Sequence, residues 1–198
     1  MTEQPRFASN VILLDTALVG QMMKFAETVF GQIGRECPTL DLAYWLSIML
    51  SDKANRKEET QVIMVHDPKS PKLNKCHPQD MMELDGMATD TIAGSMTFSV
   101  VKTENLVTKE SLFLDLMQLL LDASEVKRLL LIPATGMDDD EMEHVMNELH
   151  QQKNMSTDEG FGQATWYHMG HFKNSALCNH DQVFVSMALA LGIKPEEL

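Results

Sequence analysis

Carboxylates are the residues of this chain whose types and positions most suggest chemistry. Asp15 directly follows the apolar run Val11–Leu14, and Asp138 and Asp139 belong to an acidic stretch behind another apolar run. Asp181 lies nearer the carboxyl terminus, and Asp115 interrupts an otherwise apolar segment. Oxygen ligands of this kind suit Mg²⁺ or Mn²⁺. Carboxylates that converge from several strand ends would hold such an ion, which activates water for attack on a phosphodiester.

Strands that alternate with helices are the elements that must position these carboxylates. Short apolar runs predict strands at 11–14, 62–65, 96–100, 129–132 and 164–172. Helical spacing of apolar residues predicts helices at 19–33, 40–50, 109–124, 139–152 and 183–191. We therefore expect one α/β domain over residues 1–198, a three-layer α/β/α sandwich with a mostly parallel sheet of about five strands.

In a sheet of this kind, ligands bind in the crevice beyond the carboxyl ends of the strands. That position selects Asp15, Asp67 and the turn at 135–140. The helix at 109–124 is apolar on nearly every side, so we expect it to be largely buried, with Thr108 as its cap. A carboxylate in such a helix is paired, protonated or functional, or else Asp115 lies at the rim of the buried face.

Two of the patterns have a simpler structural interpretation. Asp138, Asp139 and Asp181 are each predicted in the first turn of a helix, with Asn179 capping the last helix, and carboxylates there interact favourably with the helix dipole whether or not a metal binds. Four further residues superficially suggest zinc: His168, His171, Cys178 and His180. Residues three apart on a strand point to opposite faces, however, so His168 and His171 would not share one ion.

Composition narrows the classes of partner and location. A net charge of −13 repels nucleic acid at long range, so RNA would need a locally basic surface. Two loops hold the candidates for that surface, Lys53, Arg56 and Lys57 in one and Lys69, Lys72 and Lys75 in the other. The three cysteines are scattered, and no segment suits a signal peptide or a membrane span, which favours the cytoplasm. The sixteen methionines suggest adaptable packing in the core rather than a methionine-lined groove.

The chain lacks the sequence motifs of several common enzyme classes. The chain has no glycine-rich dinucleotide fingerprint, no phosphate loop ending in Gly-Lys-Ser/Thr, and no Gly-x-Ser-x-Gly nucleophile elbow. Cys76 precedes His77 in a predicted loop, where no constellation that would activate the thiol is recognisable. The acidic residues therefore remain the leading chemical feature.

Three segments resemble the NYN and PIN nuclease superfamily. Val11–Asp15 is similar to the family's first strand with its leading aspartate, and 109–124 followed by 127–132 is similar to the helix and strand before its acidic turn. Residues 166–172, 175–177 and 181–184 are similar to the closing strand and helix. The resemblance implies a PIN- or Rossmann-like sheet and metal-dependent RNA cleavage. Asp15, Asp138, Asp139 and Asp181 would hold Mg²⁺ or Mn²⁺, Asp115 would assist, and the loop lysines would contact phosphates.

The chain also departs from the pattern of that superfamily. Its acids after the fourth predicted strand are displaced along Pro133–Asp140, where the family has a Ser-Gly-Asp-x-Asp-Phe type of turn. Thr16, Ala17 and Leu18 follow Asp15, where the family has an asparagine. The alternative is a degenerate member of an uncharacterised bacterial family: a catalytically inactive interaction or regulatory protein that binds another protein or a second copy of itself. The net charge favours this alternative.

Overall fold

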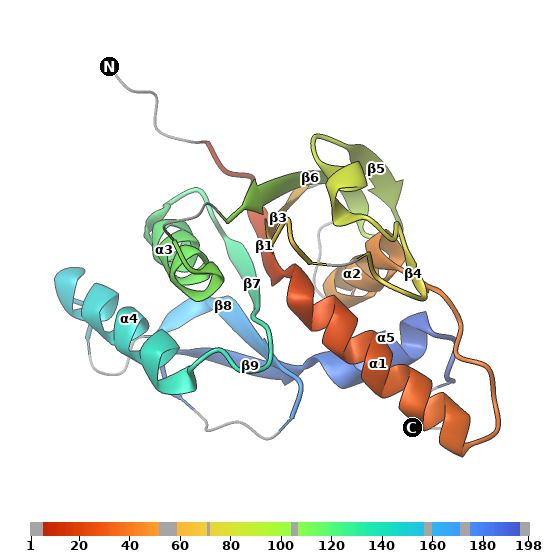
Figure 1. Ribbon diagram of the computed structural model, residues 1–198. Helices are drawn as coiled ribbons and strands as arrows, with labels where there is room; N and C mark the ends of the chain where they lie inside the picture. The colour runs from red at the N-terminus through yellow and green to blue at the C-terminus, as the bar shows by residue number, and fades with distance from the viewer. Residues whose placement is uncertain are drawn as a thin grey trace.

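One large sheet runs through the centre of the molecule. The computed structural model describes residues 6–51, 59–70, 72–103, 107–156, 160–170 and 175–194. Its seven-stranded sheet has the order β5-β6-β3-β1-β7-β8-β9 (Figure 1). The strands are β1 (Asn10–Asp15), β3 (Thr60–His66), β5 (Ala88–Thr91), β6 (Gly94–Lys102), β7 (Arg128–Ile132), β8 (Phe161–His168) and β9 (Cys178–Gln182). Within this sheet β5 is antiparallel to β6, and the other neighbours are parallel.

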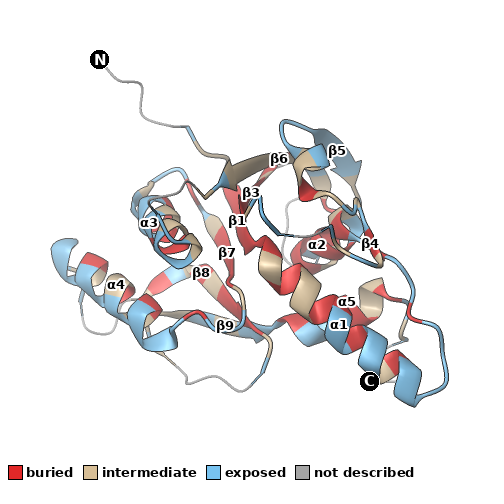
Figure 2. Ribbon diagram, viewed as in Figure 1, coloured by how far each residue is buried: buried red, intermediate tan, exposed pale blue. Residues whose placement is uncertain are grey.

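The parallel strands are wound outward from β1 in both directions. Numbered along the chain, the six parallel strands lie in the order 3-2-1-4-5-6, which is that of a doubly wound sheet. The order reverses between β1 and β7, so the chain's first strand lies at the point where ligands bind in such sheets. All six residues of β1 are buried (Figure 2), as expected for an apolar strand covered on both faces.

Helices cover both faces of the sheet and complete the predicted three layers. The helices are α1 (Thr16–Gln32), α2 (Leu42–Ser51), α3 (Lys109–Asp122), α4 (Asp139–Gln152) and α5 (Val183–Ala190). α1, α2 and α5 pack against side chains from one face, including Ile12 and Leu14. α3 and α4 pack against the other face, including Val11 and Leu13. Alternate residues of β1 therefore contribute to two separate apolar cores.

Smaller elements lie on the α1 side of the sheet. β2 (Leu40–Asp41) and β4 (Cys76–His77) form a separate two-stranded sheet, and Met81–Leu84 is a short 3-10 helix. β4 and the 3-10 helix belong to the long connection between β3 and β5, whereas β2 lies between α1 and α2. That connection returns the chain over α1, where Leu73 approaches Gly20.

The fold class, the parallel sheet and the helix order confirm the prediction, but the strand count does not. The sheet has seven strands rather than about five, because the hairpin strand β5 and the edge strand β9 are polar and short. β8 spans Phe161–His168 instead of 164–172. Asn179 lies in β9 and donates hydrogen bonds to the carbonyls of Gly162 and Ala164, so it does not cap α5. Asp181 is likewise a strand residue, not a residue in the first turn of a helix.

The helix α3 is less buried than its composition predicts. Thr108 caps it as expected, and Phe113, Leu114 and Met117 are buried. Asp115, however, is exposed, and Leu119 retains 45% of its accessible surface. The apolar character of α3 therefore exceeds what the sheet covers, because one side of the helix still faces solvent.

Candidate functional site at the carboxyl edge of the sheet

Asp15 lies at the carboxyl end of the central strand β1. The strand runs directly into α1 without a loop, and Asp15 acts as the helix cap, its Oδ1 accepting a hydrogen bond of 2.9 Å from the Ala17 amide. Its Oδ2 is 3.0 Å from Nζ of Lys109 and has no further hydrogen-bond partner among the described residues. The Asp15 side chain is 0% exposed and that of Lys109 20%. One carboxylate is thus buried against one ammonium.

The electrostatics of this pair are dominated by burial. Loss of water raises the pKa of the Asp15 carboxyl, whereas the Lys109 charge and the Ala17 hydrogen bond oppose that rise. Lys109 is the first residue of α3, which packs on the opposite face of the sheet from α1. The ion pair therefore links the two helical layers beside the central strand. Its ammonium stands against the oxygen that a divalent cation would need.

The other predicted site residues do not gather around Asp15. Asp115 is exposed on α3, six residues or about 9 Å further along the helix than Lys109. Asp138 caps α4, accepting a 2.9 Å hydrogen bond from the Asp140 amide. Asp181 is exposed in β9. In the described ranges, no three histidine, cysteine or acidic side chains are close enough together to hold a metal ion. These carboxylates do not fit a divalent ion as they stand.

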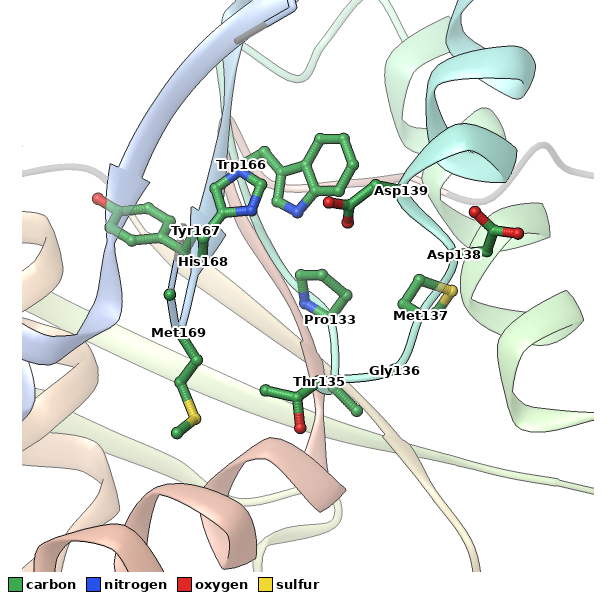
Figure 3. A pocket seen from close by; sticks show the side chains of 12 residues that line it. Pro133, Thr135, Gly136, Met137, Asp138, Asp139, Trp166, Tyr167, His168 and Met169 are labelled. Atoms are coloured by element: carbon green, nitrogen blue, oxygen red, sulfur yellow. The ribbon is translucent and has the colours of Figure 1, made fainter. Parts of the chain in front are cut away.

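A cavity of about 510 Å³ lies beyond β7 and β8, and we call it the β7–β8 cavity. One side is the turn between β7 and α4, which includes Gly136 at a φ of 107°. The opposite side is the end of β8, including Trp166 and His168. Figure 3 shows Asp139 turned toward Trp166, whereas Asp138 points away. Burial and its acidic neighbours raise the pKa of the Asp139 carboxyl.

Aromatic rings stack along the β8 side of this cavity. The ring centroids of Trp166 and His168 are 4.7 Å apart and those of His168 and His180 5.1 Å. Nε2 of His168 and Nδ1 of His180 are separated by 2.9 Å, so one proton lies between the two imidazoles. Burial and the nearby His180 lower the pKa of His168 to about 4. This pair connects β8 to the edge strand β9.

No group of three potential zinc ligands occurs among the described residues. Burial raises the pKa of Cys178 to about 11, which keeps the thiol protonated near neutral pH, and its Sγ lies 3.9 Å from Nε2 of His180. His171 lies outside the described residues.

A larger cavity of about 760 Å³ lies on the other side of the strand-order reversal, and we call it the α1 cavity. It is bounded by α1, by the segment that follows β3 and by Lys102 at the end of β6. Gln21 of α1 lines this cavity and is hydrogen-bonded to Thr135, which lines the β7–β8 cavity. The Gln21 side chain donates to the Thr135 carbonyl at 3.2 Å and accepts from the Thr135 amide at 3.0 Å. Two hollows therefore flank one hydrogen-bonded contact.

The basic loops are partly used within the protein. Lys72 is 3.5 Å from Asp80, and Lys75 is 2.7 Å from Glu36. The other predicted phosphate contacts, Lys53, Arg56 and Lys57, lie outside the described residues. Lys69 is exposed near the α1 cavity, in the turn after β3.

Comparison of the sequence with protein families finds one family whose members resemble this chain. Its model matches residues 4–198, nearly the whole chain, and is described as a family of unknown function. The chain belongs to the family DUF6621. Neither the curated proteins nor the solved structures include a match. None of the helices in the described ranges combines the length and apolar character needed to cross a membrane.

Sequence reasoning missed the residues that define these sites in this DUF6621 chain. The sequence predicts Lys109 only as the start of a helix. Lys109 and Asp15 are 94 residues apart, from 15 to 109, and nothing near Lys109 in the sequence identifies Asp15 as its partner. His66 follows a buried strand exactly as Asp15 does, a signal that was available for a ligand-facing residue. Gln21 carries no recognisable sequence signal, because its hydrogen bonds go to a backbone group.

Proposed function

We propose that this chain is a non-catalytic interaction or regulatory α/β domain of the cytosol, which keeps the ligand-binding edge of a doubly wound sheet without phosphodiesterase chemistry. The ion pair between Asp15 and Lys109 carries the proposal. A carboxylate that is fully buried and already neutralised by an ammonium 3.0 Å away serves packing and helix capping. Three free cysteines support a reducing compartment.

Electrostatics support an occupant other than RNA. The chain carries a net charge of −13, and two of its candidate phosphate-binding lysines are engaged with acidic side chains. The N-terminus of α1, where phosphates bind in many doubly wound proteins, is capped by the Asp15 carboxylate instead. We propose that the domain recognises a small molecule or another protein, which includes a second copy of itself.

A metal-dependent ribonuclease of the PIN or NYN kind is the second candidate. Its supporting observation is the strand order, because Asp15 ends β1 while Asp138 and Asp139 follow the neighbouring strand β7. This function would require Lys109 to leave Asp15 and Asp181 to approach it, with Mg²⁺ or Mn²⁺ replacing the ammonium. RNA would then bind through the basic loops.

The deciding experiment combines metal binding with cleavage. Purified protein is incubated with single-stranded RNA in Mn²⁺ or Mg²⁺, and its Tm is measured with and without each ion. We expect intact RNA and an unchanged Tm, since a specific ion site would stabilise the folded state by mass action. RNA cleavage that needs Mn²⁺ and disappears in Asp15→Asn would refute the proposal and establish the ribonuclease.

A further inference from the structure

The α1 cavity has the size and shape of a site for an elongated small molecule. One wall runs along α1 from Thr16 to Glu27, twelve residues that span about 16 Å of helix. Its volume of about 760 Å³ lies within the range of ordinary ligand sites. The cavity lies at the carboxyl ends of β1, β3 and β6, where Thr16, His66 and Lys102 line it.

His66 supplies a buried hydrogen-bonding group to this cavity. The residue is only 7% exposed, and its Nδ1 lies 3.0 Å from Oγ1 of Thr16, which is itself 3.2 Å from the Val65 carbonyl. Both contacts are hydrogen bonds when the hydroxyl donates to Val65 and accepts from Nδ1–H of neutral His66. Burial lowers the pKa of His66, which favours the neutral ring. Nε2 is then an acceptor, and no described residue donates to it.

Charged side chains around the cavity favour an anion. Lys102 lies beside His66 in the register between β6 and β3. The lining contains Lys24, Lys72 and Lys102 but only two acids, Glu27 and Asp80. Lys72 and Asp80 are paired with each other at 3.5 Å. This cationic excess is local, in a protein whose net charge is −13.

The remaining lining is apolar and adaptable. Met23, Met81 and Met82 contribute to it together with Leu73. Methionine side chains adjust to irregular or flexible apolar partners. A ligand with a hydrocarbon body would bury that body against them, next to the helix α1.

We propose that the α1 cavity binds an amphipathic organic acid that carries a hydroxyl group. The hydroxyl donates to Nε2 of His66, the carboxylate meets Lys102, and the hydrocarbon chain lies along α1 against the methionines. The inference rests on the proposed function, for which it names a ligand class, and it stands whether or not Asp15 binds a metal.

The test uses isothermal titration calorimetry on the full chain in buffer with EDTA, with 3-hydroxydecanoate and decanoate as probes. We expect 3-hydroxydecanoate to bind about tenfold more tightly, because decanoate leaves His66 without a donor. His66→Phe should remove this preference and leave both acids with similar affinity. Absence of binding by 3-hydroxydecanoate up to about 1 mM overturns the proposal. Equal binding of both probes to the unaltered chain overturns it too.

Two further variants and one control keep the test informative if His66→Phe does not fold. Lys102→Met should weaken both acids about fivefold, whereas Lys127→Met, a matched change in the loop before β7, should leave binding unchanged. Gly20→Met should weaken every probe at least about tenfold, because a Cβ at Gly20 already lies 3.1 Å from Leu73 and the longer side chain fills the cavity. Unaltered binding in Gly20→Met would place the probes elsewhere and refute the site.

Discussion

Replacement of Lys109 by methionine tests the role of the buried ion pair most directly. The change keeps the length and apolar stem of the side chain but leaves Asp15, 0% exposed, without its counterion. Breaking a buried pair in this way costs about 3 kcal/mol, at the lower end of the usual range because Lys109 is 20% exposed. For a domain of this size, that corresponds to a drop in Tm of about 10 °C.

The loss should depend on pH in a defined direction. Without Lys109, the pKa of folded Asp15 rises further above its unfolded value of about 3.9. A raised folded pKa gives stability that is present at low pH and lost as the pH rises through that pKa. We therefore expect the deficit of Lys109→Met relative to the unaltered chain to be full at neutral pH and to vanish below about pH 4.

Urea denaturation at several pH values measures this difference, with two comparisons. Asp15→Asn combined with Lys109→Met removes both charges and keeps an acceptor for the Ala17 amide, so its stability should return to within about 1 kcal/mol of the unaltered chain. Lys72→Met, which breaks the exposed pair with Asp80, should cost at most about 1 kcal/mol. A deficit in Lys109→Met that is below about 1 kcal/mol at neutral pH, or that persists unchanged in acid, refutes the reasoning.

Three other predictions follow from local geometry. Gly160→Ala should destabilise the protein by more than about 2 kcal/mol in urea denaturation, because a Cβ there would lie 2.6 Å from the Ala176 carbonyl oxygen before β9. An unchanged denaturation midpoint would contradict that contact. Asp138→Ala should cost about 1 kcal/mol through loss of the α4 cap, while Asp115→Ala on exposed α3 should stay within about 0.5 kcal/mol, and equal effects would argue against the capping role. Cys178, with a pKa raised to about 11, should react with iodoacetamide at pH 8 far more slowly than an ordinary exposed thiol, and rapid modification followed by mass spectrometry would disprove its protonated state.

The spacing of apolar residues predicted the parallel sheet and its helices, because the residues that each element buries lie close together in the sequence. Val11–Leu14 is buried on both faces and is apolar throughout, so its strand is identified without any partner. β9 was missed because Cys178–Gln182 is a polar edge strand that resembles a loop with a helix cap. Its position depends on pairing with β8, which local pattern does not encode.

The site was predicted only as a location. The position of Asp15 at the carboxyl edge of the sheet was predictable because the residue ends an apolar strand, which is a local feature of the sequence. Whether its charge meets a metal or an ammonium depends on where α3 begins relative to β1, and that is a tertiary property. The same limit applies to His180, which meets His168 only because β9 pairs with β8.

The central position of β1 also sets the order in which the molecule assembles during synthesis. Of the seven strands of this sheet, β1 is synthesised first, yet its two neighbours are β3, fifty residues later at Thr60↔Asn10, and β7, later still at Arg128↔Asn10. Until β7 emerges, β1, with its apolar run Val11–Leu14, keeps one hydrogen-bonding edge uncovered, a condition that favours aggregation and holding by chaperones. Nascent chains that stop before Arg128 should therefore depend on chaperones, and longer ones that include β7 should be released.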